Sequence, residues 1–491
     1  MMKPSERGLV LVPGLAGSGL QIALWVLGGY YLAVFLYLAA HHIAWPFELE
    51  WMEGGMVDHV RRLLQGKALY APPALDFTAF SYGPLYFYAA AAMGVLFGAD
   101  FALLRVLSAV SCLASLLLIG RWVWEESGSR QAGFLAAALY LACYPVSGAW
   151  YDLARVDSLF LLLLLSGFYL IRRHRSARSD AAAALLLALA AFCKQTAVVI
   201  TLPLLFWHIV NTPGPRKWIW PALYLTLLGS GYALMQDLTG GWFSYYAFYL
   251  PSQHPPVWWR VHHFWIDYFF KPLPFATLLG ALALVTGGRL TGRREGFWLF
   301  FTAGFFGGPW LAVVPSGAYH NVVMPAHAAL ALLCGLAYNQ PGRWHPLVSG
   351  AAVAQLLLLV YLPGRYLPPP ADRLAGEELV QRLAAVPGPV WIPSQGYLAE
   401  KAGKAGSAHR CALDDVLRGG VKADKRMLRR EMEAALREGR FAVVVTGAEG
   451  LADSLAGAYQ AGVKIFAEPG TFRPITGWQA RPEWWFARRM E

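Results

Sequence analysis

The sequence predicts an all-α polytopic membrane protein with a small α/β domain at its C-terminal end. Hydrophobic residues make up 57% of the 491 residues, charged residues only 14%, and the mean hydropathy is +0.42. A soluble domain would carry about a quarter charged residues. In lipid only helices and closed barrels satisfy the backbone, and the long apolar runs lack the alternation of a barrel. The chain is therefore expected to cross a membrane many times as helices.

The net charge of +11 does not indicate a nucleic-acid partner. The basic residues are not clustered with aromatic residues on a soluble module, and many lie in short loops between apolar runs, as the positive-inside rule predicts. Four cysteines fall within apolar runs and one lies in the C-terminal tail, which supports neither a disulfide framework nor a zinc cluster. These residues are Cys112, Cys143, Cys193, Cys334 and Cys411.

Eleven stretches have the length and composition of spans, since a crossing helix needs about 20 apolar residues. The first follows Lys3 and Arg7 without a small-residue cleavage site, so it is interpreted as a retained signal-anchor helix. The stretches lie near residues 17–39, 101–122, 131–149, 156–171, 181–194, 196–210, 218–237, 272–288, 297–315, 321–338 and 345–362. Residues 1–367 are expected to form the membrane domain.

The apolar stretch 82–98 decides the topology, because a crossing there would place the basic loop 172–178 outside. If 82–98 lies in the interface, that loop and the other basic loops fall inside, which agrees with the positive-inside rule. We therefore predict an amphipathic first outer loop at 41–100, a cytoplasmic N-terminus and an external C-terminus.

This topology brings four segments to the outer face. They are 41–100, 151–157, 238–271 and 316–321. The loop 238–271 is rich in Trp, Tyr and Phe, and an aromatic belt at the headgroup level explains it at least as well as a platform for stacking sugars.

From about residue 368 the composition changes, and charged and turn residues become frequent. Residues 390–392 and 441–445 have the pattern of short buried strands, and the basic segment 422–438 between them has that of a helix. We expect residues 368–491 to form a small extracytoplasmic α/β domain.

Glu48, Glu50 and Glu53 form an acidic stretch directly after the first span. At helical spacing Glu50 and Glu53 share a face, and either carboxylate could accept the proton of an attacking hydroxyl group. The alternative is an exposed juxtamembrane helix whose acidic residues pair with Arg61 and Arg62.

Three further polar groups interrupt apolar runs at the same face. Arg155 and Asp157 could pair with each other, but an ionisable residue within a span also indicates function. Lys194 could bind a lipid phosphate through its single positive charge. Alternatively, it is an ordinary lysine at a helix end whose side chain extends to the membrane–water interface. Residues 317–321 open a late span with hydrogen-bonding groups, and His254, His262 and His263 lack the spacing of a metal site.

Several short motifs follow the acidic loop in a characteristic order: GKALY at 66–70, YGPLY at 82–86, ARVDSL at 154–159 and KQT at 194–196. Together they resemble the GT-C superfamily of polyprenyl-phosphate-sugar-dependent glycosyltransferases. The chain is most similar to the bacterial group related to protein O-mannosyltransferases and lipid A aminoarabinose transferase (glycosyltransferase family 39). The resemblance runs from about residue 20 to 365.

The resemblance implies roles for individual residues. Glu50 or Glu53 takes the place of the family's catalytic first-loop carboxylate, although the spacing Glu-x-Glu-x-x-Glu departs from the usual adjacent pair. Asp157 matches the second-loop aspartate. Arg155 and Lys194 are expected at the donor phosphate. The residues expected to contact substrate are Tyr82, Tyr319, His320 and Asn321.

The resemblance further implies an inverting transfer of a sugar from a polyprenyl-phosphate carrier to an extracytoplasmic glycan, lipid or protein acceptor, at a bacterial inner membrane. No cofactor is expected, and nothing in the sequence supports a divalent metal. The main alternative is a multi-span lipid or sugar transporter or flippase. It is less favoured because the polar groups gather at one face rather than at the midplane of two repeats. A non-catalytic scaffold is the third possibility.

Overall fold

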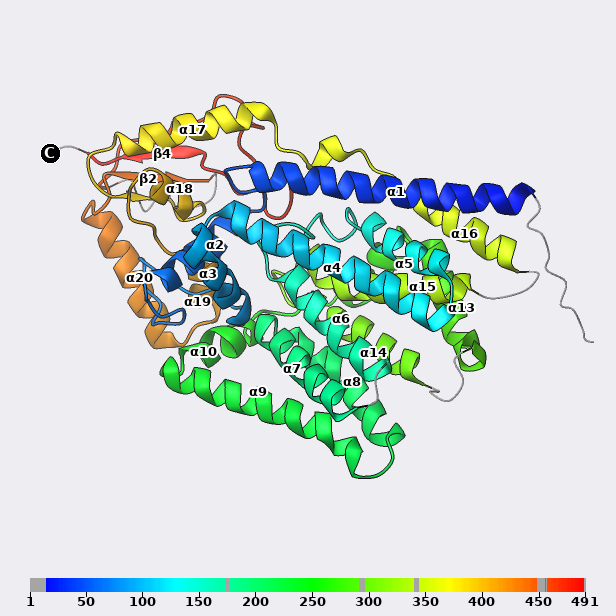
Figure 1. Ribbon diagram of the computed structural model, residues 1–491. Helices are drawn as coiled ribbons and strands as arrows, with labels where there is room; N and C mark the ends of the chain where they lie inside the picture. Colours follow the sequence, from blue (N-terminus) through cyan, green and yellow to red (C-terminus); the bar gives the residue numbers. More distant parts are fainter. Residues whose placement is uncertain are drawn as a thin grey trace, which may run out of the picture.

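All eleven apolar stretches assigned to spans are helices, and they pack side by side as a bundle (Figure 1). The computed structural model describes residues 15–173, 176–290, 296–339, 344–447, 455 and 457–489. The eleven helices are α1 (Leu15–Ala44), α4 (Phe101–Ser127), α5 (Arg130–Ala142), α6 (Asp157–Arg173), α7 (Ala177–Cys193), α8 (Thr196–Asn211), α9 (Ile219–Leu238), α13 (Pro274–Leu290), α14 (Phe297–Val313), α15 (Met324–Tyr338) and α16 (His345–Leu358).

Not every helix of the bundle is long enough to cross a bilayer by itself. Among the described residues, three helical stretches have the required length and composition: Ser18–Ala44, Phe101–Ser127 and His320–Tyr338. The number rises to as many as five if two bent helix pairs are each taken as one span. A multi-pass membrane protein is therefore supported, and the number of eleven crossings stays a prediction.

The predicted first outer loop holds two helices, α2 (Glu53–Leu64) and α3 (Leu85–Phe97), which pack against each other. With 13 residues, α3 is shorter than the roughly 20 that a crossing requires. Because α5 has the same length, the position of 82–98 in the interface stays a prediction.

The aromatic segment 238–271 consists of short helical pieces rather than a long helix. The short elements of the membrane domain are η1 (Pro215–Trp218), α10 (Trp242–Ser244), η2 (Tyr245–Tyr249), α11 (Leu250–Ser252), α12 (Arg260–Trp265), η3 (Ile266–Phe270), η4 (His320–Val323) and η5 (Pro363–Tyr366). Phe243 and Tyr246 are buried, whereas Trp258 and Trp259 are exposed, so only part of this aromatic surface packs inside the protein.

The C-terminal residues form a four-stranded sheet with helices around it. The elements are α17 (Pro370–Ala384), β1 (Val390–Trp391), α18 (Gly396–Lys401), α19 (Arg410–Gly419), α20 (Lys422–Arg437), β2 (Val443–Thr446), β3 (Val463–Lys464) and β4 (Trp484–Ala487). The strand order is β1-β2-β4-β3, with β1 and β2 parallel and the other pairs antiparallel. Both predicted strands and the predicted basic helix are present, within one or two residues of their expected bounds.

This sheet region packs on the first outer loop, at the same end of the bundle as α2 and α3 (Figure 1). Arg61 forms an ion pair with Glu400 at 2.5 Å, and the backbone N–H of Ala408 donates to the Leu75 carbonyl at 2.9 Å. His409 lies 2.9 Å from the Trp51 carbonyl through Nε2. The acidic stretch is thus covered by the C-terminal region instead of facing solvent.

Gly83 lies where the first outer loop meets the end of α7. A Cβ atom there would be 2.0 Å from the backbone oxygen of Phe192. We expect Gly83→Ala to lower the free energy of unfolding by about 1–3 kcal/mol, the usual cost of overpacking. The free energy of unfolding is measured by thermal unfolding in detergent.

Gly229→Ala is the control, since a Cβ at Gly229 meets nothing within 4 Å. Equal stability of the two variants would contradict this prediction.

Candidate functional site

The predicted site residues gather at the end of the bundle that faces the C-terminal sheet. They come from the segment after α1, from the loop between α5 and α6, from the junction of α7 and α8, and from the segment before α15. Side-chain contacts connect three of the four segments predicted at one face. Arg155 joins segment 151–157 to segment 41–100 through Glu50, and Asp157 joins it to segment 316–321 through Asn321.

Glu53 begins α2 and is fully buried, in a bidentate ion pair with Arg105. Arg105 donates from Nε to Oε1 at 3.0 Å and from Nη2 to Oε2 at 2.6 Å. The carboxylate also accepts the backbone N–H groups of Leu49 and Ala154, both at 2.7 Å. Burial by itself would raise the pKa of Glu53, but Arg105 and these N–H groups outweigh it and hold the pKa below its ordinary value. Both oxygens of Glu53 are therefore occupied.

Arg105 is a site residue that the sequence analysis missed. Besides Glu53, it donates to three backbone carbonyl groups, that of His42 in the last turn of α1 and those of Trp45 and Phe47 just after it, at 2.6–2.7 Å. An arginine inside the apolar stretch 101–122 was a usable signal, because a charge within a span is costly unless it has partners.

Glu50 lies before α2 rather than on it, so the expectation that Glu50 and Glu53 share a helix face is wrong. Segment 45–52 is not helical because Arg105 and Glu53 bind its backbone groups instead. The alternative pairing with Arg61 and Arg62 is also not observed: Arg61 binds Glu400, and the Nε–H of Arg62 donates to the Ala68 carbonyl at 2.6 Å.

The two oxygens of Glu50 have different environments. Oε2 accepts from Arg155 Nη1 at 2.6 Å and from the Met52 N–H at 3.2 Å. Oε1 is buried and has no hydrogen-bond partner among the described residues. Burial raises the pKa of Glu50 to about 7, with Arg155 opposing this shift and Glu53 adding to it. A carboxylate with a free oxygen and a pKa near neutrality has the properties of a general base.

Arg155 pairs with Glu50 and not with Asp157, its neighbour in the sequence. Its Nη2 donates to the Tyr82 hydroxyl group, and its guanidinium carbon lies 5.5 Å from the centre of the Tyr82 ring. Its Nε is buried without a partner among the described residues, so this cation keeps one donor for a further acceptor.

Asp157 joins two other predicted residues into one cluster. At the first turn of α6, it accepts from Lys194 Nζ at 2.6 Å and from Asn321 Nδ2 at 3.0 and 3.1 Å. The side chains of Lys194 and Asp157 are only 10% and 2% exposed. Lys194 caps the end of α7, and the ammonium group can donate three hydrogen bonds. The cluster fixes one buried positive charge in a defined position.

Tyr319 and His320 lie beside this cluster without joining its hydrogen bonds. The Tyr319 ring stacks on Trp150 with centres 6.1 Å apart, and Trp150 in turn lies 5.8 Å from the Arg155 guanidinium carbon. His320 is exposed and packs against Tyr268. Both residues are near the site, on its more accessible side.

No group of three or more potential metal ligands occurs among the described residues. Two of the three histidines of the aromatic segment have acidic partners: His254 pairs with Asp415, and His263 pairs with Asp267. The donor set of the site, carboxylates paired with arginine and lysine, suits an anionic ligand better than a cation.

Similar folds occur among solved membrane enzymes. ArnT from Cupriavidus metallidurans aligns with a TM-score of 0.64 at 12% identity, covering 94% of this chain and 97% of that chain. ArnT bound to undecaprenyl phosphate aligns with a TM-score of 0.60 at 13% identity, covering 94% of this chain and 98% of that chain. The arabinofuranosyltransferase AftD from Mycobacteria aligns with a TM-score of 0.56 at 14% identity, covering 95% of this chain and 40% of that chain. These alignments show that the chain shares the fold of these solved enzymes.

A family model agrees with the structural comparison. Residues 81–236 match the family of dolichyl-phosphate-mannose-protein mannosyltransferases (PMT_2). This range contains Tyr82, Arg155, Asp157 and Lys194, whereas the acidic stretch and Asn321 lie outside it. No curated protein sequence matches significantly. The family match and the shared fold together support a glycosyltransferase.

Arg105 is expected to hold the site together. Arg105→Leu leaves the Glu53 carboxylate buried without its partner, and we expect a loss of about 3–5 kcal/mol in the free energy of unfolding. Arg121→Leu is a matched control on the same helix, because its side chain is 64% exposed and pairs with Glu125 at the surface, so little change in stability is expected. Thermal unfolding of both variants in detergent would separate them, and similar melting temperatures would refute the structural role of Arg105.

Proposed function

We propose that this protein transfers a sugar from a polyprenyl monophosphate carrier to an extracytoplasmic acceptor by an inverting displacement, with Glu50 as the general base. The observation that carries the proposal is the buried Glu50 carboxylate. One of its oxygens accepts from Arg155, and the other has no hydrogen-bond partner in the described part of the chain. ArnT, which shares the fold, has been crystallised with undecaprenyl phosphate, and that lipid is a carrier of the proposed kind.

The choice between the two candidate glutamates follows from their hydrogen bonds. Glu53 has both oxygens occupied and a lowered pKa, so it is a poor proton acceptor. Glu50 has an available oxygen and a pKa of about 7, close to the optimum for general base catalysis at neutral pH. In this proposal Glu50 takes the acceptor's proton and Glu53 positions the segment that carries Glu50.

The displacement needs no covalent enzyme intermediate. The acceptor oxygen forms a bond to the anomeric carbon from the face opposite the phosphate, while the bond from that carbon to the phosphate oxygen breaks. The acceptor proton passes to Glu50, and the lipid leaves as polyprenyl monophosphate. The released charge is stabilised by Lys194 and by the Nε–H group of Arg155, the type of electrostatic contribution that usually dominates. Asp157 and Asn321 position Lys194, while Tyr82 positions Arg155 and, with Tyr319 and His320, borders the bound substrate.

The helix directions support the proposed orientation at a bacterial inner membrane. Asp157 begins α6 at the site, and Arg172 and Arg173 end the same helix at the far end of the bundle. Basic residues are enriched on the cytoplasmic side, so the site and the C-terminal sheet region would be extracytoplasmic and the N-terminus cytoplasmic.

Glu50→Gln tests the base directly. We expect the variant to fold normally and to lose about two to four orders of magnitude in kcat, the usual contribution of general acid–base catalysis. In the wild type, kcat should rise as pH increases through about 7 and then level off, because only ionised Glu50 accepts a proton. The assay is transfer of radiolabelled sugar from polyprenyl-phosphate donors. Glu378→Gln, an exposed change on α17, is the control, and a folded Glu50→Gln variant with the wild-type rate would exclude Glu50 as the base.

Lys194 is tested through binding of the lipid phosphate. Hydrogen bonds to charged groups contribute about 1.5–3 kcal/mol, so Lys194→Met should weaken the Kd for undecaprenyl phosphate about 10- to 100-fold. Lys271→Met is the control, because that lysine is 69% exposed and pairs with Asp267. Equal affinity of wild type and Lys194→Met for undecaprenyl phosphate would show that Lys194 does not bind the donor. If the wild type also releases no sugar, transport would be favoured over transfer.

A further inference from the structure

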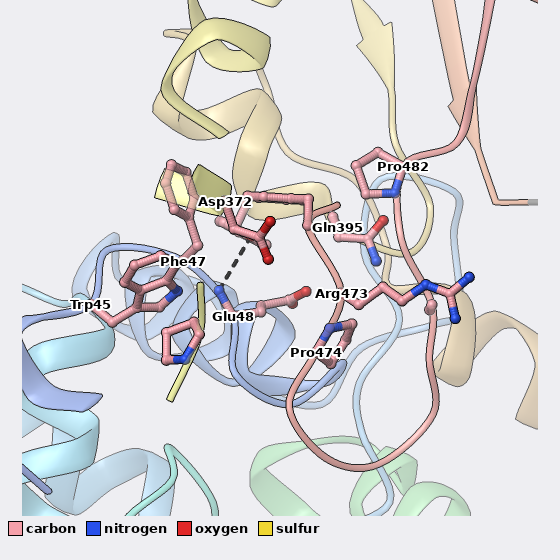
Figure 2. A pocket seen from close by; sticks show the side chains of 12 residues that line it. Trp45, Phe47, Glu48, Asp372, Gln395, Arg473, Pro474 and Pro482 are labelled. Atoms are coloured by element: carbon pink, nitrogen blue, oxygen red, sulfur yellow. Dashed lines mark hydrogen bonds between the residues drawn. The ribbon is translucent and has the colours of Figure 1, made fainter. Parts of the chain in front are cut away.

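A small cavity lies between the first outer loop and the C-terminal region (Figure 2). Its volume of about 20 Å³ is enough for one water molecule or one hydroxyl group. Polar side chains from separate segments line it, with apolar and aromatic neighbours. Glu48, Asp372 and Gln395 are largely buried, whereas Arg473 is exposed and donates to the Pro469 carbonyl. Trp45, Phe472 and Tyr397 are among the other lining residues.

Gln395 is the most informative of these residues. It is only 2% exposed, and its Nε2 has no hydrogen-bond partner among the described residues. Leaving such a donor unpaired costs about 1–3 kcal/mol. A buried amide that lines a cavity and has no partner among the residues that the structure describes indicates that a bound molecule supplies the acceptor.

The two carboxylates complement this donor. Glu48 is fixed in place, because its Oε1 accepts the Gly54 N–H at 2.9 Å and its own N–H donates to the Tyr397 hydroxyl group at 3.3 Å. Asp372, in the first turn of α17, is 5% exposed. Carboxylates accept hydrogen bonds and an amide Nε2 donates them. A hydroxyl group is a small ligand that does both.

The cavity and the base lie along the same pair of chain segments. Glu50 and Thr476 pair as a parallel bridge, and the Ile475 N–H donates to the Leu49 carbonyl at 2.9 Å. Glu48 and Pro474, two residues earlier on each segment, line the cavity. Two residues of chain reach at most about 7 Å between backbone atoms, so the segment that lines the cavity also carries Glu50.

Gly477 shows how closely the C-terminal segment approaches the base. Its φ is +77°, a conformation that favours glycine, and a Cβ there would lie 3.1 Å from Glu50 Oε1. The C-terminal region therefore borders both the base and the cavity, so an acceptor that reaches Glu50 comes near the cavity as well.

We propose that this cavity is an acceptor subsite that takes a hydroxyl group of a carbohydrate, held by Glu48, Asp372 and Gln395, while a second hydroxyl group of the same acceptor reaches Glu50. This inference rests on the proposed function, since it names the acceptor class of that reaction. The aromatic and proline residues at the cavity suit the apolar faces of a sugar ring.

The experiment measures transfer of radiolabelled sugar from polyprenyl-phosphate donors to octyl glucoside, octyl galactoside and octyl mannoside, with a serine-containing peptide as the non-carbohydrate acceptor. For Gln395→Met and Glu48→Gln we expect KM for the accepted glycoside to rise about tenfold or more, while Kd for undecaprenyl phosphate is unchanged. Gln381→Ala and Glu378→Gln, both exposed on α17, are the controls and should keep the wild-type KM.

Stability separates a ligand site from a structural one. Gln395→Met removes an unpaired buried donor, so its melting temperature should be equal to or above that of the wild type. An unchanged glycoside KM with a lower melting temperature would mean that the cavity holds a buried water only, and would overturn the inference. Transfer to the peptide but to no glycoside would also overturn it and leave the proposed function standing. If the wild type consumes no donor at all, the proposed function fails first.

Discussion

The buried ion pair between Glu53 and Arg105 is the interaction on which the site depends. Arg105 binds three carbonyl groups at and just after the end of α1, and Glu53 binds the N–H groups of Leu49 and Ala154. One pair of side chains thus connects α1, α2, α4 and the loop before α6. Removing either partner leaves a buried charge uncompensated, which is far more costly than losing a surface pair.

The three glutamates of the acidic stretch have different properties because each meets a different partner. Glu53 is occupied by an arginine and two N–H groups, and its pKa is lowered. Glu50 meets Arg155 on one oxygen only, and burial raises its pKa to about 7. Glu48 is directed to the cavity below the C-terminal region. Residues of the same type within six positions are therefore suited to structural, catalytic and binding roles.

The C-terminal region completes the site instead of merely being attached to the membrane domain. Thr476 pairs with Glu50, and Gly477 lies against the Glu50 carboxylate. His409 contacts the Trp51 carbonyl. Glu50 is fully buried beneath these contacts, and electrostatic interactions are stronger where water is excluded. The environment of the Glu50 carboxylate is therefore set by both parts of the chain.

The sequence by itself determined the eleven apolar helices, the strands at 390–391 and 443–446, and the segments that carry polar groups to one end. Long apolar runs leave the backbone few alternatives to helix in lipid. Only the tertiary structure decided which glutamate has a free oxygen and that Arg105 belongs to the site. Those properties depend on partners 52 residues away for Glu53 and 105 residues away for Glu50. Local patterns do not encode such distances, because packing of separate helices brings the partners together.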